Sequence, residues 1–193
     1  MRSNSYWTIL PLSLALVAGT AILPGCGEKK PPPKPVAPPP PPPPPAPKQI
    51  DVGTLLQTSK ADKRVQFPQE KAPVDDTVAL AVINLASAIA KGDSKAMGGM
   101  MINVGKDVLD QLVASGQWDE STSKIEAVRV VELIAPTAKP ESFNVSFAVQ
   151  EPGVAYLVRF IGTLDNGRYV FTGMPGGRKT HARANQFDDG IFD

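Results

Sequence analysis

Few side chains in this sequence are of the types that carry out catalysis or bind metals. There is one cysteine, Cys26, and one histidine, His181. A single thiol cannot form an internal disulfide bond. His181 lies in a tail without apolar periodicity, which argues against a histidine-based triad or a histidine-rich metal site. The Gly-rich stretch 173–177 lacks the Lys-Ser/Thr pair of a nucleotide-binding loop.

Carboxylates are the remaining candidates for acid–base chemistry. One carboxyl group with a raised pKa in an apolar pocket is enough for an isomerase-like mechanism. Helix ends and solvent-facing positions explain these residues more simply, so we expect no catalytic residue. The candidates are Asp93, Asp107, Asp110, Glu126 and Glu132.

Three methionines have the spacing of a metal-binding helix face. Met97, Met100 and Met101 fall at i, i+3 and i+4, and thioethers suit Cu(I). Methionine is also the usual filler of irregular cores. We favour the core and predict neither a metal site nor a cofactor.

An aromatic and cationic binding patch is a further alternative. Trp118, Tyr156, Arg159 and Tyr169 could form it. Side chains of these types on a half-buried sheet are more often part of the core or of the sheet surface. We therefore keep the patch as the weaker interpretation.

The first 25 residues have the layout of an export signal. Arg2 is the only charged residue, and an apolar stretch runs from Ile9 to Leu23. This stretch is shorter than the roughly 20 residues that a membrane-spanning helix needs. A cleaved signal is therefore favoured over a permanent span. The alternative is an ordinary secretory signal followed by an incidental free thiol.

Leu23-Pro24-Gly25-Cys26 closes that stretch and resembles the lipobox of bacterial lipoproteins. Leu23, Gly25 and Cys26 match the usual pattern, and Pro24 departs from it at the variable position. The resemblance implies a diacylglyceryl thioether on Cys26, cleavage before it, and acylation of the new amino terminus, typically with palmitate. Several acyl chains make a durable anchor. Gly27, which is not the Asp of inner-membrane retention, favours the outer membrane where the host has one.

A proline-rich segment, residues 26–48, follows the expected anchor. Thirteen of the 21 prolines lie between Pro31 and Pro47. Proline lacks a backbone donor and fixes φ, which favours polyproline II. Residues 31–48 would span about 55 Å at 3.1 Å per residue. We predict a disordered but stiff stalk that holds a domain off the membrane or within the cell wall; a docking ligand for an aromatic groove is the alternative.

The charge balance narrows the choice of partners. Loss of Arg2 with the signal leaves basic and acidic residues equal in number. Nucleic acid is therefore not an expected partner, because it would require a strong basic excess. The expected partner is the membrane, through acylated Cys26, with a cell-wall component or a protein as a further one.

The segments before the first strong helix are harder to assign. Residues 49–73 are expected to be a linker that could form a short element packed on the domain. Asp75 and Thr77 can cap a helix that ends at Lys91-Gly92. A second helix is expected to run through the methionines to Val104, and a third from Lys106 to Ser115.

The apolar period then changes from 3.6 to 2, which indicates strands. They are expected at residues 125–134, 142–149, 154–164 and 168–173. Glu151-Pro152-Gly153 and Asp165-Asn166-Gly167 are turn signals, and Asn-Gly suits a type I′ hairpin turn. Residues 176–193 are expected to be a flexible tail.

Three helices followed by a four-stranded antiparallel meander predict an α+β domain over residues 74–175. This order, with the turn Ala88 to Asp93, is similar to the cystatin-like, or nuclear transport factor 2-like, superfamily. The resemblance implies a pocket between sheet and helices, used by some members for catalysis and by many only for binding.

The sequence therefore predicts an exported, lipid-anchored envelope protein, at the periplasmic face or the cell surface. It presents a small non-catalytic binding or interaction domain on its stalk. Two alternatives stay open: a pocket enzyme of the nuclear transport factor 2-like kind, and a purely structural envelope spacer.

Overall fold

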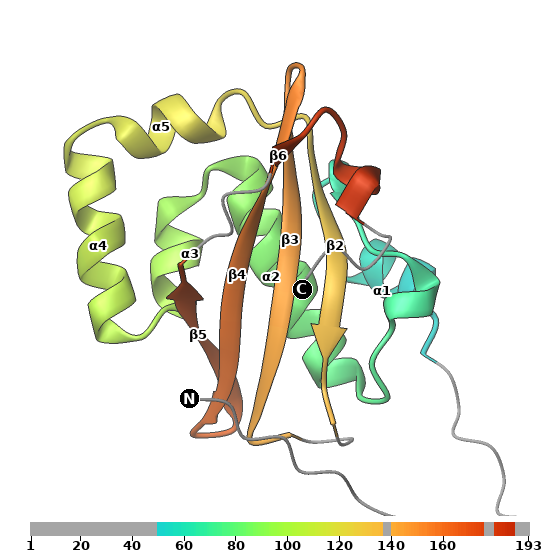
Figure 1. Cartoon of the computed structure of the whole chain (residues 1–193). Helices are drawn as coiled ribbons and strands as arrows, with labels where there is room; N and C mark the ends of the chain where they lie inside the picture. The colour runs from blue at the N-terminus through green and yellow to red at the C-terminus, as the bar shows by residue number, and fades with distance from the viewer. Residues whose placement is uncertain (1–49, 137–139, 176–179, 188–193) are drawn as a thin grey trace, which may run out of the picture. The chain divides into compact units, whose positions relative to one another are not determined.

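The expected antiparallel meander is the centre of the fold. The computed structural model describes residues 50–136, 140–175 and 180–187. In it, helices cover one face of a mostly antiparallel sheet (Figure 1), so the α+β class is confirmed. The predicted signal peptide, Cys26 and the stalk lie outside the described residues, as do residues 176–179 and 188–193 of the predicted tail.

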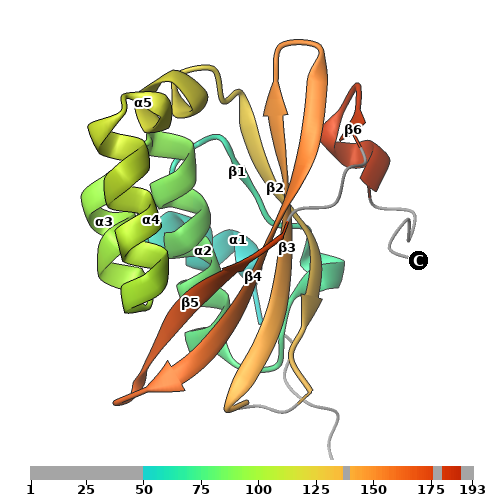
Figure 2. The ribbon, with the colours of Figure 1, turned by 60° about the vertical axis from the view of Figure 1, so that its left-hand side comes forward.

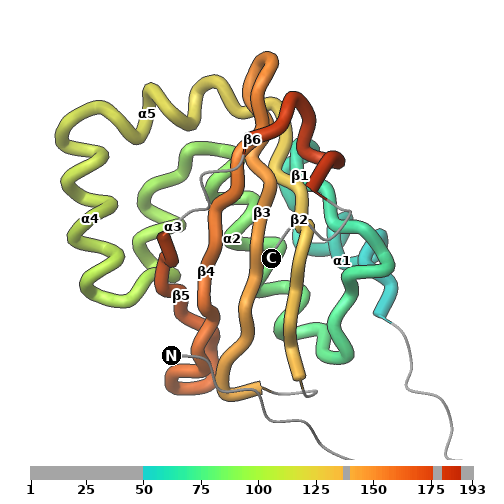
Figure 3. Tube along the Cα trace, viewed as in Figure 1, coloured from blue at the N-terminus to red at the C-terminus, as the bar shows by residue number. Residues whose placement is uncertain are grey.

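Four long strands pair in chain order. They are β2 (Ala127–Ile134), β3 (Ser142–Glu151), β4 (Val154–Asp165) and β5 (Arg168–Met174). Two short strands join them: β1 (Val65–Gln66) runs parallel to β2, and β6 (Thr180–His181) runs antiparallel to β4. The sheet therefore has six strands rather than the four expected. Figure 3 follows the trace of β1 beside β2.

Local turn chemistry sets the register of the meander. Asn166 and Gly167 have φ values of 47° and 81° between β4 and β5, as a type I′ turn requires. The alternation predicted for β3 is confirmed, because Phe143, Val145 and Phe147 lie in the core beneath the helices. Ala148 belongs to a smaller cluster on the opposite face.

The longest helix is α2 (Asp76–Lys91), and its predicted ends are confirmed. The Asp75 side chain accepts a hydrogen bond from the Thr77 backbone N–H, and Gly92 adopts the left-handed conformation at φ 67°. Ten residues of α2 are buried. A helix that is apolar on most sides is stable only in such a position.

The expected second helix ends earlier than predicted. The structure has α3 (Ser94–Met100), α4 (Asn103–Ala114) and α5 (Gln117–Thr122), and α5 was not expected. Met101 is extended and bridges to Phe171 in β5, and the Ile102 backbone N–H donates to the Phe171 carbonyl. Pairing with the sheet edge therefore interrupts the helical pattern.

The folded part extends beyond the predicted range 74–175 on both sides. Within the expected linker, α1 (Val52–Thr58), β1 and the 3₁₀ turn η1 (Gln69–Lys71) form. Val52 is 1% exposed, and Val65 and Phe67 are also buried in the core. Val65 and Phe67 have the spacing of a strand, but two residues are too few to establish a period, and Val52 lies 13 positions earlier.

Part of the predicted flexible tail is folded. β6 is followed by the 3₁₀ turn η2 (Ala184–Phe187), and Phe187 is only 1% exposed. The Gln150 side chain holds this segment, since its Nε2 donates to the Ala182 carbonyl and its Oε1 accepts from the Ala184 N–H. Figure 2 shows η2 on one side of the sheet and α2–α5 on the other.

Candidate functional site

An apolar cavity lies between the helices and the sheet. It has a volume of about 180 Å³ and is lined from α2, α3, α4, α5, β3 and β4. Its four uncharged polar side chains are Gln117, Ser121, Thr122 and Tyr156. Small-molecule sites combine an apolar lining with a few polar groups in this way.

Trp118 fixes one wall of the cavity. Its indole N–H donates to the Gly92 carbonyl at 2.7 Å, and its ring is buried. The Thr122 hydroxyl donates to the Trp118 carbonyl one turn later in α5. The position of the indole ring is therefore fixed by α5, which carries it, and by the left-handed end of α2, which accepts its hydrogen bond.

Tyr156 contributes from the sheet. Its hydroxyl donates to Glu151 Oε1 at 3.0 Å. Burial, together with this hydrogen bond to Glu151, raises the pKa of Tyr156 to about 12. The phenol therefore stays protonated at neutral pH. Its oxygen keeps a lone pair that can accept a hydrogen bond from a ligand.

The four residues of the alternative aromatic and cationic patch lie in three separate places. Trp118 and Tyr156 line the cavity together. The Tyr169 hydroxyl donates to the Pro140 carbonyl, and its ring packs edge-on against Phe143. Arg159 lies on the opposite face of β4 from Tyr156, because consecutive strand residues alternate.

None of the five candidate carboxylates lines the cavity. The Asp93 side chain caps α3, and Asp110 forms an ion pair with Lys106 one turn away. Asp107 and Glu126 are exposed. Glu132 accepts a hydrogen bond from the buried Ser146 on the far face of the sheet. These positions do not place an acid where a cavity mechanism would need it.

The methionines do not converge either. Met97 lines the cavity, Met100 lines hollows on the other side of α2, and Met101 packs against Gly105. Three thioethers on separate surfaces cannot share one copper ion. Within the part of the chain that the structure describes, no three His, Cys, Asp or Glu residues cluster as a metal site, and no helix is long and apolar enough to cross a membrane.

A second concave surface runs along the exposed face of α2. Two hollows of about 540 and 290 Å³ share Asn84 and Met100, and we call their union the α2 groove. Leu80, Ala81, Met100 and Phe171 give it an apolar floor. Its charged lining residues are Arg168 at the β4–β5 hairpin and Lys60, Lys91 and Asp93 at the far end.

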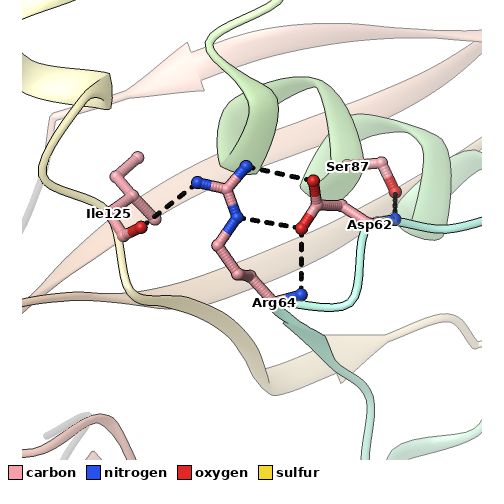
Figure 4. Close-up of polar contacts among 4 residues, drawn as sticks. All are labelled: Asp62, Arg64, Ser87 and Ile125. Atoms are coloured by element: carbon pink, nitrogen blue, oxygen red, sulfur yellow. Dashed lines mark hydrogen bonds and ion pairs between the residues drawn. The ribbon is translucent and has the colours of Figure 1, made fainter.

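Lys60 enters the α2 groove from a strained backbone. It follows α1 with a φ of 52°, where glycine is the usual residue and another residue costs about 1 kcal/mol. Figure 4 shows how the next residues are fixed. Arg64 Nε and Nη2 donate to the Asp62 carboxylate, Arg64 Nη1 donates to the Ile125 carbonyl, and the Asp62 N–H donates to Ser87 Oγ on α2.

The hydrogen bonds between Arg64 and Asp62, which we call the clamp, also determine the ionisation state of Asp62 beside the groove. The hydrogen bonds from Arg64 lower the pKa of Asp62 to about 2 from 3.8, so its carboxylate is ionised and already engaged. Sequence patterns could not reveal which residues line the two concave surfaces, because each surface combines residues far apart in the chain. The left-handed backbone at Lys60 could not be predicted either, because the residue there is not a glycine.

The comparisons with known proteins add no family. The sequence matches no protein-family model and no curated protein.

Proposed function

We propose that this chain is an exported, lipid-anchored envelope protein that presents a small, non-catalytic binding domain on a proline-rich stalk. The membrane is reached through acylated Cys26, and the outer membrane is favoured where the host has one. The domain binds a small apolar ligand in the cavity between α2–α5 and the sheet.

The observation that carries the proposal is the chemistry of the cavity wall. A space of about 180 Å³ exceeds the engineered 150 Å³ cavity that accepts benzene in another protein. Tyr156 lines this space together with the apolar side chains of Ile89, Val149 and Phe160, and its hydroxyl oxygen can accept a hydrogen bond. The expected ligand is therefore an aromatic or branched aliphatic molecule with one hydroxyl group.

Two sequence features support the anchor and the stalk. The lipobox-like Leu23-Pro24-Gly25-Cys26 ends an apolar stretch too short to span a bilayer, and the unbroken run Pro38–Pro45 favours a stiff spacer. Mass spectrometry of the mature amino terminus tests the anchor. An unmodified Cys26, or a mature start elsewhere, contradicts it.

Ligand binding tests the cavity, with p-cresol as the probe. Thermal unfolding of the full chain should move upward with p-cresol concentration, since a ligand that binds only the native state stabilises it. In Val158→Phe the added ring fills the cavity, and the shift should disappear.

The matched control is Ile161→Phe, which adds the same ring three residues on, on the opposite face of β4. It should keep the wild-type response to p-cresol. No shift for the wild-type protein, or equal shifts for the wild type and Val158→Phe, would contradict cavity binding.

The spacer alternative makes a different prediction. If the chain only sets a distance in the envelope, deleting Pro38–Pro45 should abolish its cellular role while p-cresol still stabilises the domain. If cavity binding is the function, Val158→Phe should abolish that role in a full-length, correctly anchored chain.

A further inference from the structure

The α2 groove has the features of a peptide-docking surface, independent of the cavity. We propose that it binds an extended polypeptide segment that carries acidic side chains at its two ends and apolar side chains between them. This surface lies on the opposite side of α2 from the cavity, so either site can fail without the other.

Charge complementarity defines the ends of the bound segment. Arg168 stands at one end, and Lys60 and Lys91 stand at the other. The two acids nearest to the lysines are already engaged: Asp93 accepts a hydrogen bond from the Ala96 N–H, and Asp62 is held by Arg64. Three of the four charged side chains that line the groove are cations, so the lining itself carries a net positive charge.

The length of the groove sets the length of the segment. Thr77 and Lys91 both line it, and 14 residues of α-helix cover about 21 Å. An extended chain covers that distance in about six or seven residues. Carboxylates at both ends of a heptapeptide would therefore reach Arg168 and the lysines together.

The edge of the sheet favours an extended segment. Phe171 directs its carbonyl away from β4, toward the Ile102 N–H, and strand residues alternate in this respect. Tyr169, two residues earlier, therefore directs its backbone N–H and carbonyl to the same side of β5, away from β4, and Tyr169 is one of the residues that line the groove. A neighbouring extended chain can pair with these groups, as in strand addition.

Lys60 ends helix α1 in the left-handed conformation, where its N–H donates to the Gln57 carbonyl and the Ala61 N–H donates to the Leu56 carbonyl. A lysine held at a φ of 52° is less stable there than a glycine would be. Its neighbour Lys63 is equally charged and exposed but does not line the groove. The pair offers a matched test within one loop.

The experiment measures fluorescence anisotropy of the labelled peptide Glu-Val-Thr-Leu-Thr-Val-Glu with the full chain in nonionic detergent. Saturable binding is expected, and the same peptide with glutamine at both ends should bind about tenfold more weakly. Lys60→Gly and Arg168→Ala should each weaken binding about threefold, whereas Lys63→Ala should leave it unchanged.

Lys60→Gly separates binding from folding. It should raise the urea midpoint of unfolding, because it relieves the left-handed strain, while it weakens peptide binding. Gly99→Phe gives a second check: a Cβ built at this lining residue meets no atom within 4 Å, so the ring should occupy the groove and weaken peptide binding without unfolding the domain.

Three results would overturn the proposal. The first is the absence of saturable binding up to about 1 mM. The second is wild-type affinity in the Lys60→Gly/Arg168→Ala double variant. The third is displacement of the peptide by glycerophosphoglycerol at equal concentration, which would assign the groove to anionic lipid headgroups instead.

Discussion

Thr122 occupies the space that a side chain at Gly92 would need. A Cβ built on Gly92 lies 2.5 Å from Thr122 Oγ1, and the same glycine accepts the indole N–H of Trp118. The end of α2 and the wall of the cavity therefore depend on one residue without a side chain.

Replacing Gly92 by alanine should destabilise the domain. The left-handed backbone costs about 1 kcal/mol for alanine, and displacing Thr122 should bring the loss to about 2 kcal/mol. Urea unfolding measures it. Gly99→Ala is the control, because it has open space and an ordinary helical position, and it should be neutral or slightly stabilising. Equal effects of the two substitutions would contradict the account of this contact.

The clamp between Asp62 and Arg64 should make the free energy of unfolding depend on pH in the acidic range. The folded pKa of Asp62 is about 2, below its ordinary 3.8, so its stabilisation is complete above pH 4 and is lost as pH falls from 4 toward 2. The loss is at most about 2 kcal/mol, because one pKa unit corresponds to about 1.4 kcal/mol.

Urea unfolding of wild type and Asp62→Asn between pH 2 and 7 checks this. The difference in free energy of unfolding between the two proteins should shrink toward acid pH. A difference that stays constant across this range would show that the carboxylate of Asp62 is not stabilised by Arg64.

Phe187 should be a core residue rather than part of a loose tail. Its ring packs edge-on against His181 and shares a cluster with Val131 and Leu157. Phe187→Ala should cost about 3 kcal/mol, or release residues 180–187 locally for proteolysis. A variant with wild-type stability and wild-type resistance to protease would return this segment to the flexible tail.

Local chemistry explains which elements could be predicted. The alternation at Phe143–Val149, the Asn166-Gly167 turn and the Gly92 cap each depend on neighbouring residues, and all three are confirmed. Buried residues that stand alone in their segment could not be predicted in this way. Trp118 is the one large apolar residue of α5, and Phe187 is the one aromatic residue of η2. One apolar residue in a short element gives no periodic pattern, so neither element was predicted.

The sites depend on packing between distant residues. In the alternative patch, Trp118 and Tyr156 do line one cavity. Arg159 lies on the other face of β4, and Tyr169 pairs with Leu164, eight residues along β4 from Tyr156. The α2 groove was not predicted at all, since Lys60 and Arg168 meet α2 only in the folded chain.

Membrane attachment through Cys26 is the central claim, and cell fractionation of a Cys26→Ser variant tests it most directly. The account predicts that the wild-type chain sediments with membranes and that Cys26→Ser moves to the soluble fraction while its domain stays folded, as judged by p-cresol stabilisation. A Cys26→Ser chain that remains with the membranes at the wild-type level would contradict the account.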